Sequence, residues 1–475
     1  MSNELVHQDA TRLAELIRTK EVSPVEVVQA HLDRIALADP QVNAVVALAD
    51  GALKAAQAAE RAVMAGAPLG PLHGVPFTAK DSIDSAGVPT QFASPIFAGR
   101  IPGEDATTLA RMKGAGAILL AKTNHPEFSF WIESDNLLSG RTRNPWNLDR
   151  TPGGSSGGES AAIAAGMSPI GLATDVAISV RGPAALTGVI GLKATHGRIP
   201  MTGIWPRVPR RFWHVGPMAR SVRDIALAYS VLAGPDGADG HATSPMSLDA
   251  GVGAKPGRPV RVGWLVEPGF GLIDDDVAAT VKAAAEALQG LGVVVEPVRI
   301  PVLERIDALG LLWKLQAMET KPAFRAATAG HEDKIFKHVQ AVFDTPDTSI
   351  EDFVAAEQGI EAMRDGFARY FRDYDALLCP VTPVPAHPHD AAEFVINGQT
   401  VSSLHVMDAT APFSVTGLPG LAMRFGTSRE GLPVGVQLVS PWLAESTVLY
   451  LAALLESVSP VRDLRPSLAS MGVKA

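Results

Sequence analysis

The sequence has a single cysteine, Cys379, and this scarcity excludes two structural features. One cysteine cannot form an internal disulfide, and it cannot build a cysteine-rich metal site. Cys379 lies in the apolar segment 377–380, where a free cysteine usually packs in the core. We therefore expect a core residue here rather than a nucleophile.

Positive charge and long apolar runs are also lacking. The chain has 41 Lys and Arg against 50 Asp and Glu, a formal net charge of −9, and no basic run, which disfavours a nucleic-acid partner. It has no uncharged apolar run of about eighteen residues, and its first residues lack the pattern of a secretory signal. With 47% apolar and 19% charged residues, the composition predicts a large core. We expect a cytoplasmic protein with no membrane partner.

Glycine and serine, by contrast, gather in residues 151–193. The run GGSSGG at 153–158 lacks Cβ atoms at four positions, which opens backbone conformations closed to other residues. An alanine-rich segment follows at 160–166, and free amides at its start would favour negative charge. A second serine motif, DVAISVR at 175–181, places Ser179 after Ser155 in the chain.

Taken alone, the glycine-serine run fits several structures. It could be a flexible linker, an anion-binding nest or a nucleophile loop. No G-K-[ST] follows it, which argues against a phosphate loop. Its G-x-S-x-G spacing fits the elbow of α/β hydrolases, but that elbow follows a strand, and residues 143–150 do not read as one.

Three motifs in order resemble the amidase signature family, serine hydrolases of amide bonds. They are G-V-P-x-x-x-K-D at 74–81, GGSSGG at 153–158 and D-x-x-x-S-x-R at 175–181. The GLK-x-T-x-GR-x-P pattern at 191–200 and GLPVGVQL at 431–438 extend the likeness over nearly the whole chain. The resemblance implies an α/β fold, with one α/β/α layered domain around a large mixed β-sheet.

The resemblance implies catalytic roles for Lys80, Ser155 and Ser179. Ser179 would attack the substrate carbonyl, and Ser155, held by a cis peptide, would carry the proton between Ser179 and Lys80. A serine hydroxyl needs such a base, and none of the twelve histidines lies inside either serine motif. Lysine can serve where burial lowers its pKa, and the apolar residues before Lys80 permit that burial.

The resemblance also implies an oxyanion hole and supporting residues. The oxyanion would be held by the backbone amides of Val176, Ala177, Ile178 and Ser179, with support from Gly154, Ser156, Asp175 and Arg181. The family usually has two glycines where this chain has Ala177 and Ile178. Because a β-branched residue resists positive φ, we expect either ordinary backbone angles or a reshaped loop, with an acyl pocket altered near Ile178.

Apolar periodicity predicts alternating helices and strands, which is typical of a mixed sheet covered on both faces. A capping box predicts a helix over 23–37, and residues 72–77 predict a strand that brings Lys80 to its end. Residues 302–374 should be helical and cover the site. Within one domain over 1–475, we expect N-terminal helices (1–65), a catalytic core (66–235), a loop excursion (236–258) and the remaining sheet with covering helices (259–475).

The sequence thus predicts a serine amidohydrolase that cleaves the C–N bond of small carboxamides with apolar or aryl acyl groups, with hydrazides and anilides as further candidates. Candidate pocket residues are Phe128, Trp131, Ile178, Trp205 and Trp213. The expected partner is a small-molecule amide, without metal or cofactor, and a homodimer is left open. Two alternatives remain: a component of a tRNA-dependent amidotransferase, and a binding protein with an impaired site, suggested by Ala177 and Ile178.

Overall fold

The centre of the molecule is an eleven-stranded mixed sheet. The computed structural model describes residues 2–243 and 257–473. β2 runs parallel to β3 and β4, whereas β6 is antiparallel to β4, so the predicted mixed sheet is confirmed. In sheet order the strands are β1 (Val45–Leu48), β3 (Ile118–Thr123), β2 (Pro76–Lys80), β4 (Ile170–Asp175), β6 (His214–Ala219), β5 (Ile190–Lys193), β12 (Gly420–Thr427), β13 (Pro433–Val439), β9 (Ala376–Pro380), β7 (Arg261–Trp264) and β8 (Val294–Pro297).

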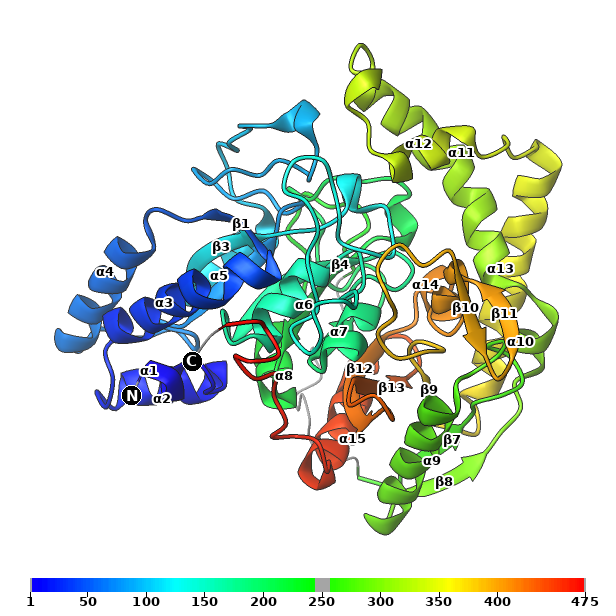
Figure 1. Cartoon of the computed structure of the whole chain (residues 1–475). Helices are drawn as coiled ribbons and strands as arrows, with labels where there is room; N and C mark the ends of the chain where they lie inside the picture. The colour runs from blue at the N-terminus through cyan, green and yellow to red at the C-terminus, as the bar shows by residue number, and fades with distance from the viewer. Residues whose placement is uncertain (1, 244–256, 474–475) are drawn as a thin grey trace.

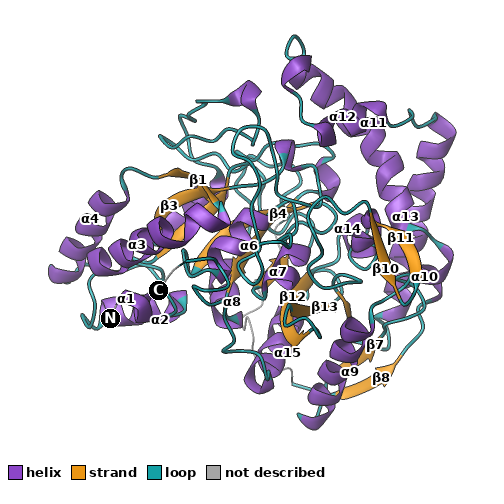
Figure 2. Cartoon of the chain, viewed as in Figure 1, coloured by secondary structure: helices purple, strands orange, loops and turns teal. Residues whose placement is uncertain are grey.

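Helices cover both faces of this sheet (Figures 1 and 2). A Cβ on Gly435 of β13 would meet Ala185 of α7 (Arg181–Thr187), whereas one on Gly426 of β12 would meet Thr280 of α9 (Asp275–Gly290). Gly426 pairs with Val434, the neighbour of Gly435, and successive strand residues point to opposite faces. Helix α7 therefore covers one face together with α6 (Gly157–Ala164), and α9 covers the other with α8 (Val222–Leu232) and α15 (Glu445–Val458).

The remaining helices extend the layers at both ends of the sheet. In Figure 1 the N-terminal helices lie beside β1 and β3, and α11, α12 and α13 lie together at the upper right. No helix in the described ranges is both long and apolar enough to cross a membrane. The bounds are α1 (Ser2–Leu5), α2 (Ala10–Arg18), α3 (Pro24–Val42), α4 (Ala52–Met64), α5 (Thr107–Gly114), α10 (Pro301–Arg305), α11 (Ala308–Thr328), α12 (Lys337–Asp344), α13 (Ile350–Tyr370) and α14 (Ala411–Val415), and β10 (Glu393–Ile396) pairs with β11 (Gln399–Ser402) in a separate hairpin.

Two predicted boundaries differ from the structure. Helix α3 has the predicted capping box, in which Ser23 and Glu26 exchange hydrogen bonds, but it continues five residues beyond residue 37, to Val42, because its apolar face stays buried past Pro40. Strand β2 begins at Pro76 and includes Lys80, since pairing with β3 sets its limits and residues 72–75 form a turn. Residues 244–256 of the predicted loop excursion lie outside the described residues.

Candidate active site

The side chain of Lys80 is fully buried at the end of β2. Its Nζ donates to Ser155 Oγ at 2.6 Å and to Thr174 Oγ1 at 2.9 Å. Burial lowers the pKa of the Lys80 ammonium well below its usual value, although the carboxylates of Asp175 and Glu159 oppose that shift. A downward shift of this kind is what allows a buried lysine to act as a neutral base.

The glycine-serine loop is packed backbone against backbone. The peptide between Gly154 and Ser155 is cis. A Cβ on Gly154 would lie only 2.5 Å from the Glu133 amide nitrogen, so no larger residue fits there. The Ser134 hydroxyl donates to the Ser155 carbonyl at 3.3 Å, and the Ser156 hydroxyl donates to the carbonyl of Thr174 at 3.2 Å. These contacts fix the loop against the end of β4.

The turn that carries Ser179 is braced by Asp175 and Arg181, both fully buried. The Asp175 carboxylate accepts the amide of Val180 at 3.0 Å and two bonds from the Arg181 guanidinium at 3.0 Å. Although burial favours the protonated acid, Arg181 beside it holds the pKa of Asp175 below its usual range. The guanidinium also donates to the Ala177 carbonyl at 2.9 Å. The ion pair thus holds both sides of the turn.

The backbone amides of residues 176–179 donate to no other residue within the described ranges. Val176, Ala177 and Ile178 are nevertheless buried, with 4% to 9% of their surface exposed, and buried amides without a partner are rare in proteins. Neither Ala177 nor Ile178 has a positive φ, so this turn uses ordinary backbone angles. A cluster of free amides is the arrangement that stabilises a developing oxyanion.

The hydroxyl of Ser179 has no hydrogen-bond partner among the described residues, and none joins it to Ser155. The structure therefore brings Lys80 onto Ser155 but leaves the second link of the predicted relay open. Contacts of this kind are often long without substrate and tighten once it binds.

Ser179 lines a small, mostly apolar cavity of about 40 Å³. Two of the five predicted pocket residues, Trp131 and Ile178, line it. The others on its wall are Ser129, Phe130, Ile132, Val176, Ala177, Leu312, Trp313, Gln316, Leu404 and Met407. Among these residues, all of them described, none has a charged side chain.

The other three predicted pocket residues, Phe128, Trp205 and Trp213, do not line this cavity. The rings of Phe128 and Trp205 pack edge to face, 4.7 Å apart, in an aromatic cluster with Phe92. Trp213 is buried, and its indole donates to the Val208 carbonyl at 3.0 Å. Their aromatic surfaces are used in packing and are closed to a ligand in this cavity.

Sequence reasoning missed the part of the wall contributed by distant segments. Leu312, Trp313 and Gln316 come from α11, and Leu404 and Met407 come from the 3₁₀ turn Ser403–Met407. The prediction that residues 302–374 cover the site is confirmed for α11. The only sequence signal for these individual residues was the general amphipathic pattern, which does not say what a helix covers.

A second buried acid, Glu159 of α6, acts electrostatically on Lys80. It accepts hydrogen bonds from Thr78 of β2 and, at 2.7 Å, from Thr123 of β3. A Cβ on Gly171 of β4 would fall 1.8 Å from its carboxylate, so a glycine is required there. Thr78 and Lys80 are two apart on β2 and point to the same face. Burial raises the pKa of Glu159 to about 7.

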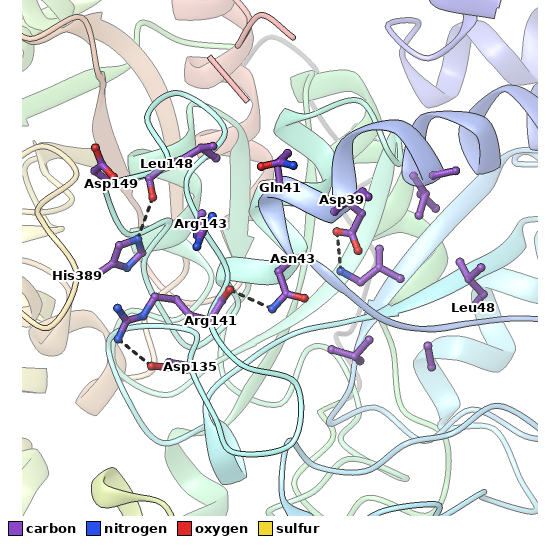
Figure 3. Close-up of a pocket in the computed structure, with 16 residues that line it drawn as sticks. Asp39, Gln41, Asn43, Leu48, Asp135, Arg141, Arg143, Leu148, Asp149 and His389 are labelled. Atoms are coloured by element: carbon purple, nitrogen blue, oxygen red, sulfur yellow. Dashed lines mark hydrogen bonds and ion pairs between the residues drawn. The ribbon is translucent and has the colours of Figure 1, made fainter. Parts of the chain in front are cut away.

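A larger cavity of about 940 Å³ lies elsewhere, between the end of α3, β1 and the loop around Arg141 (Figure 3). Its polar groups largely pair with one another: Arg141 binds Asp135 at 2.9 Å, and Asn43 donates to the Arg141 carbonyl at 3.0 Å. It contains none of the predicted catalytic residues. Within residues 2–243 and 257–473, no group of three or more His, Cys, Asp or Glu side chains could hold a metal ion.

The site combines a buried lysine that donates to a serine with a nearby serine turn whose backbone amides are free. These are the groups that a lysine-dependent serine hydrolase requires. Comparison with known proteins gives the family. The chain belongs to the amidase family, whose model matches residues 26–449. It therefore belongs with enzymes that act on carbon–nitrogen bonds.

Individual relatives differ in what they act on. The chain is 34% identical to the A subunit of glutamyl-tRNA(Gln) amidotransferase from Acidothermus cellulolyticus, over 96% of this chain and 95% of that protein. It is 33% identical to an acylamidase of Rhodococcus erythropolis, over 96% and 97%. Its fold matches a solved structure of 6-aminohexanoate cyclic dimer hydrolase with a TM-score of 0.87 and 30% identity, covering 98% and 99% of the two chains.

Proposed function

We propose that this protein is an autonomous serine amidohydrolase that cleaves the C–N bond of small, uncharged carboxamides with apolar or aryl acyl groups. Lys80, Ser155 and Ser179 are its catalytic residues, and the amides of residues 176–179 form its oxyanion hole. Anilides and hydrazides share the same acyl–nitrogen bond and are further candidate substrates.

In the proposed reaction, Ser179 Oγ attacks the carbonyl carbon while its proton passes through Ser155 to the neutral amine of Lys80. The free amides of the turn hold the oxyanion, a type of contact worth roughly 3 to 4 kcal/mol. The proton returns through Ser155 to the substrate nitrogen as the C–N bond breaks, and the amine leaves. Water then attacks the acyl ester on Ser179, and its proton follows the same path until the free serine is restored.

The observation that carries this proposal is the uncharged cavity beside Ser179. A glutamine substrate brings an ammonium and a carboxylate, and burying either without a partner is costly. No described residue lining the cavity has a charged side chain to meet them. Apolar and aromatic residues instead supply the wall, as expected for an apolar acyl group, and the cavity of about 40 Å³ must open further to admit an aryl one.

The test is hydrolysis by the purified chain alone, measured over a panel of aliphatic, aryl and anilide amides. Ser179→Ala should abolish turnover, and Lys80→Ala should lower kcat by about 10²- to 10⁴-fold, because general base catalysis contributes that much. Ser160→Ala is the matched control, since this buried hydroxyl donates to the Gly157 carbonyl in α6. Wild-type turnover in both site variants would rule out the mechanism.

The similarity to the A subunit of the tRNA-dependent amidotransferase supports a second candidate, a component that releases ammonia from glutamine within a larger assembly. That function requires glutamine hydrolysis that depends on partner proteins, and little activity on aryl amides. A third candidate is a binding protein without turnover, and a fluorophosphonate probe that reacts with an activated serine tests it. Labelling that is lost in Ser179→Ala would exclude it.

A further inference from the structure

One polar side chain on the cavity wall has no assigned partner. Gln316 on α11 is 7% exposed and lines the cavity together with Ser179. Its side-chain amide makes no hydrogen bond to any other residue that the structure describes. The side-chain atoms of Gln316 are not among the buried polar atoms that lack a partner, so its amide reaches the open space of the cavity. An unpaired amide in that position is free to bond a ligand.

The surroundings of Gln316 offer little else for it to bind. Leu312, one turn earlier on the same face of α11, is apolar, and Trp313 offers only an indole N–H; both line the cavity. Ser129, the other polar side chain on this wall besides Ser179, has its hydroxyl 3.2 Å from the His125 ring. Besides Ser179, Gln316 is thus the described wall residue left whose side chain can both donate to and accept from a ligand, since the indoles of Trp131 and Trp313 only donate.

We propose that Gln316 recognises an uncharged polar group on the acyl part of the substrate. The substrate class is then a neutral amide with an apolar or aryl body that also carries a hydroxyl or a similar hydrogen-bonding group away from the scissile carbonyl. A carboxamide side chain both donates and accepts, so it pairs with a hydroxyl in either direction. This inference rests on the proposed function, because it places the acyl group in the cavity beside Ser179.

Because no described residue on the cavity wall is charged, the polar group on the substrate should be neutral. No described wall residue provides a counter-charge for a carboxylate or an ammonium, and a primary amide cannot replace one. An acyl group without any polar atom leaves Gln316 unpaired when it displaces water from the cavity. Sites built to bond a substrate hydroxyl discriminate strongly against analogues that lack it.

The experiment compares 3-phenylpropanamide with its 3-hydroxyphenyl, 4-hydroxyphenyl and 4-carboxyphenyl derivatives. We expect the wild type to favour one hydroxylated amide over the unsubstituted one by about tenfold in kcat/KM, and to disfavour the carboxylate. Gln316→Leu should remove that preference. Leu312→Met is the matched control, because it changes the same wall without changing its polarity, and it should keep the ratio.

A binding measurement separates this inference from the proposed function. In Ser179→Ala, quenching of Trp131 and Trp313, which line the cavity, reports the dissociation constant of each amide without turnover. The same tenfold preference should appear there and disappear in the double variant Ser179→Ala, Gln316→Leu. A preference in binding without hydrolysis by the wild type would support the inference and contradict the proposed function.

The inference is overturned if the wild type does not distinguish hydroxylated from unsubstituted amides, or if Gln316→Leu keeps the wild-type ratio. Gln316→Met is a second variant of similar length, and it should also lose the preference. A merely structural role for Gln316 predicts that both variants lower kcat/KM equally for every amide in the panel.

Discussion

At the scale of single residues, the electrostatic setting of Lys80 decides whether the amine can accept a proton. Two buried carboxylates, Asp175 and Glu159, raise its pKa, while burial lowers it further than they raise it. Asp175 is engaged with Arg181. Glu159, by contrast, is held by two hydroxyls, and its own pKa of about 7 is raised by burial. Its charge therefore changes near pH 7.

Removing the Glu159 charge should shift the pH profile of the reaction. Because the carboxylate raises the pKa of Lys80, Glu159→Gln lowers it, and the acid limb of kcat/KM should move to lower pH. The measurement is kcat/KM against pH for one amide. Glu456→Gln is the control, since Glu456 is also an acid whose pKa is raised by burial but is not among the groups that shift Lys80. An unshifted acid limb in Glu159→Gln would contradict this account.

At the scale of elements, the residues that the sequence predicted best are those held by local backbone contacts. The second serine motif is a short segment in which the Asp175 side chain accepts a hydrogen bond from the Val180 amide and so closes the turn. Its sequence pattern therefore predicts its local geometry. The positions of the aromatic residues were predicted less well. Phe128 and Ser129 have left-handed φ angles of 58° and 59°, after which Phe130 and Trp131 line the cavity while Phe128 packs away from it. No sequence pattern predicts these two φ angles. The contribution of α11 to the cavity wall depends on tertiary packing, which the sequence pattern does not specify.

The turn between β4 and α7 gives a prediction about the acyl pocket. The Ile178 side chain lines the cavity and packs over Gly182, where a Cβ would come within 2.5 Å of it. Ile178→Ala should widen the pocket and raise kcat/KM for bulky acyl amides relative to small ones. It should also cost about 2–4 kcal/mol of unfolding free energy, as for other large-to-small core changes, measured by urea denaturation.

The control for that variant is Ile163→Ala in α6, a buried isoleucine that does not line the cavity. It should destabilise the protein similarly but leave the bulky-to-small ratio unchanged. An unchanged ratio in Ile178→Ala would mean that the acyl group does not contact this turn.

At the scale of the whole molecule, the two halves of the chain complete one site. Strand β5 of the first half pairs with β12 of the second. The Arg181 guanidinium donates to the Thr410 carbonyl at 3.1 Å, to Gln437 Oε1 at 3.0 Å and to Ser414 Oγ at 2.7 Å. The residue that braces the Ser179 turn is thus held as much by the C-terminal half as by the turn itself.

A chain divided between residues 243 and 257 tests this dependence. The fragment 1–243 contains Lys80, Ser155 and Ser179, yet it should not hydrolyse amides, because it lacks the C-terminal partners of Arg181 and the α11 wall of the cavity, and β5 becomes an exposed edge. Co-expression with 257–475 should restore cooperative unfolding and activity, since the sheet contacts between the halves are intact. Hydrolysis by the first fragment alone would show that the catalytic residues are positioned within their own half. In that case the Arg181 contacts across the sheet would stabilise the fold without shaping the turn, and substitutions at Ser414 and Gln437 would lower the free energy of unfolding while leaving kcat unchanged.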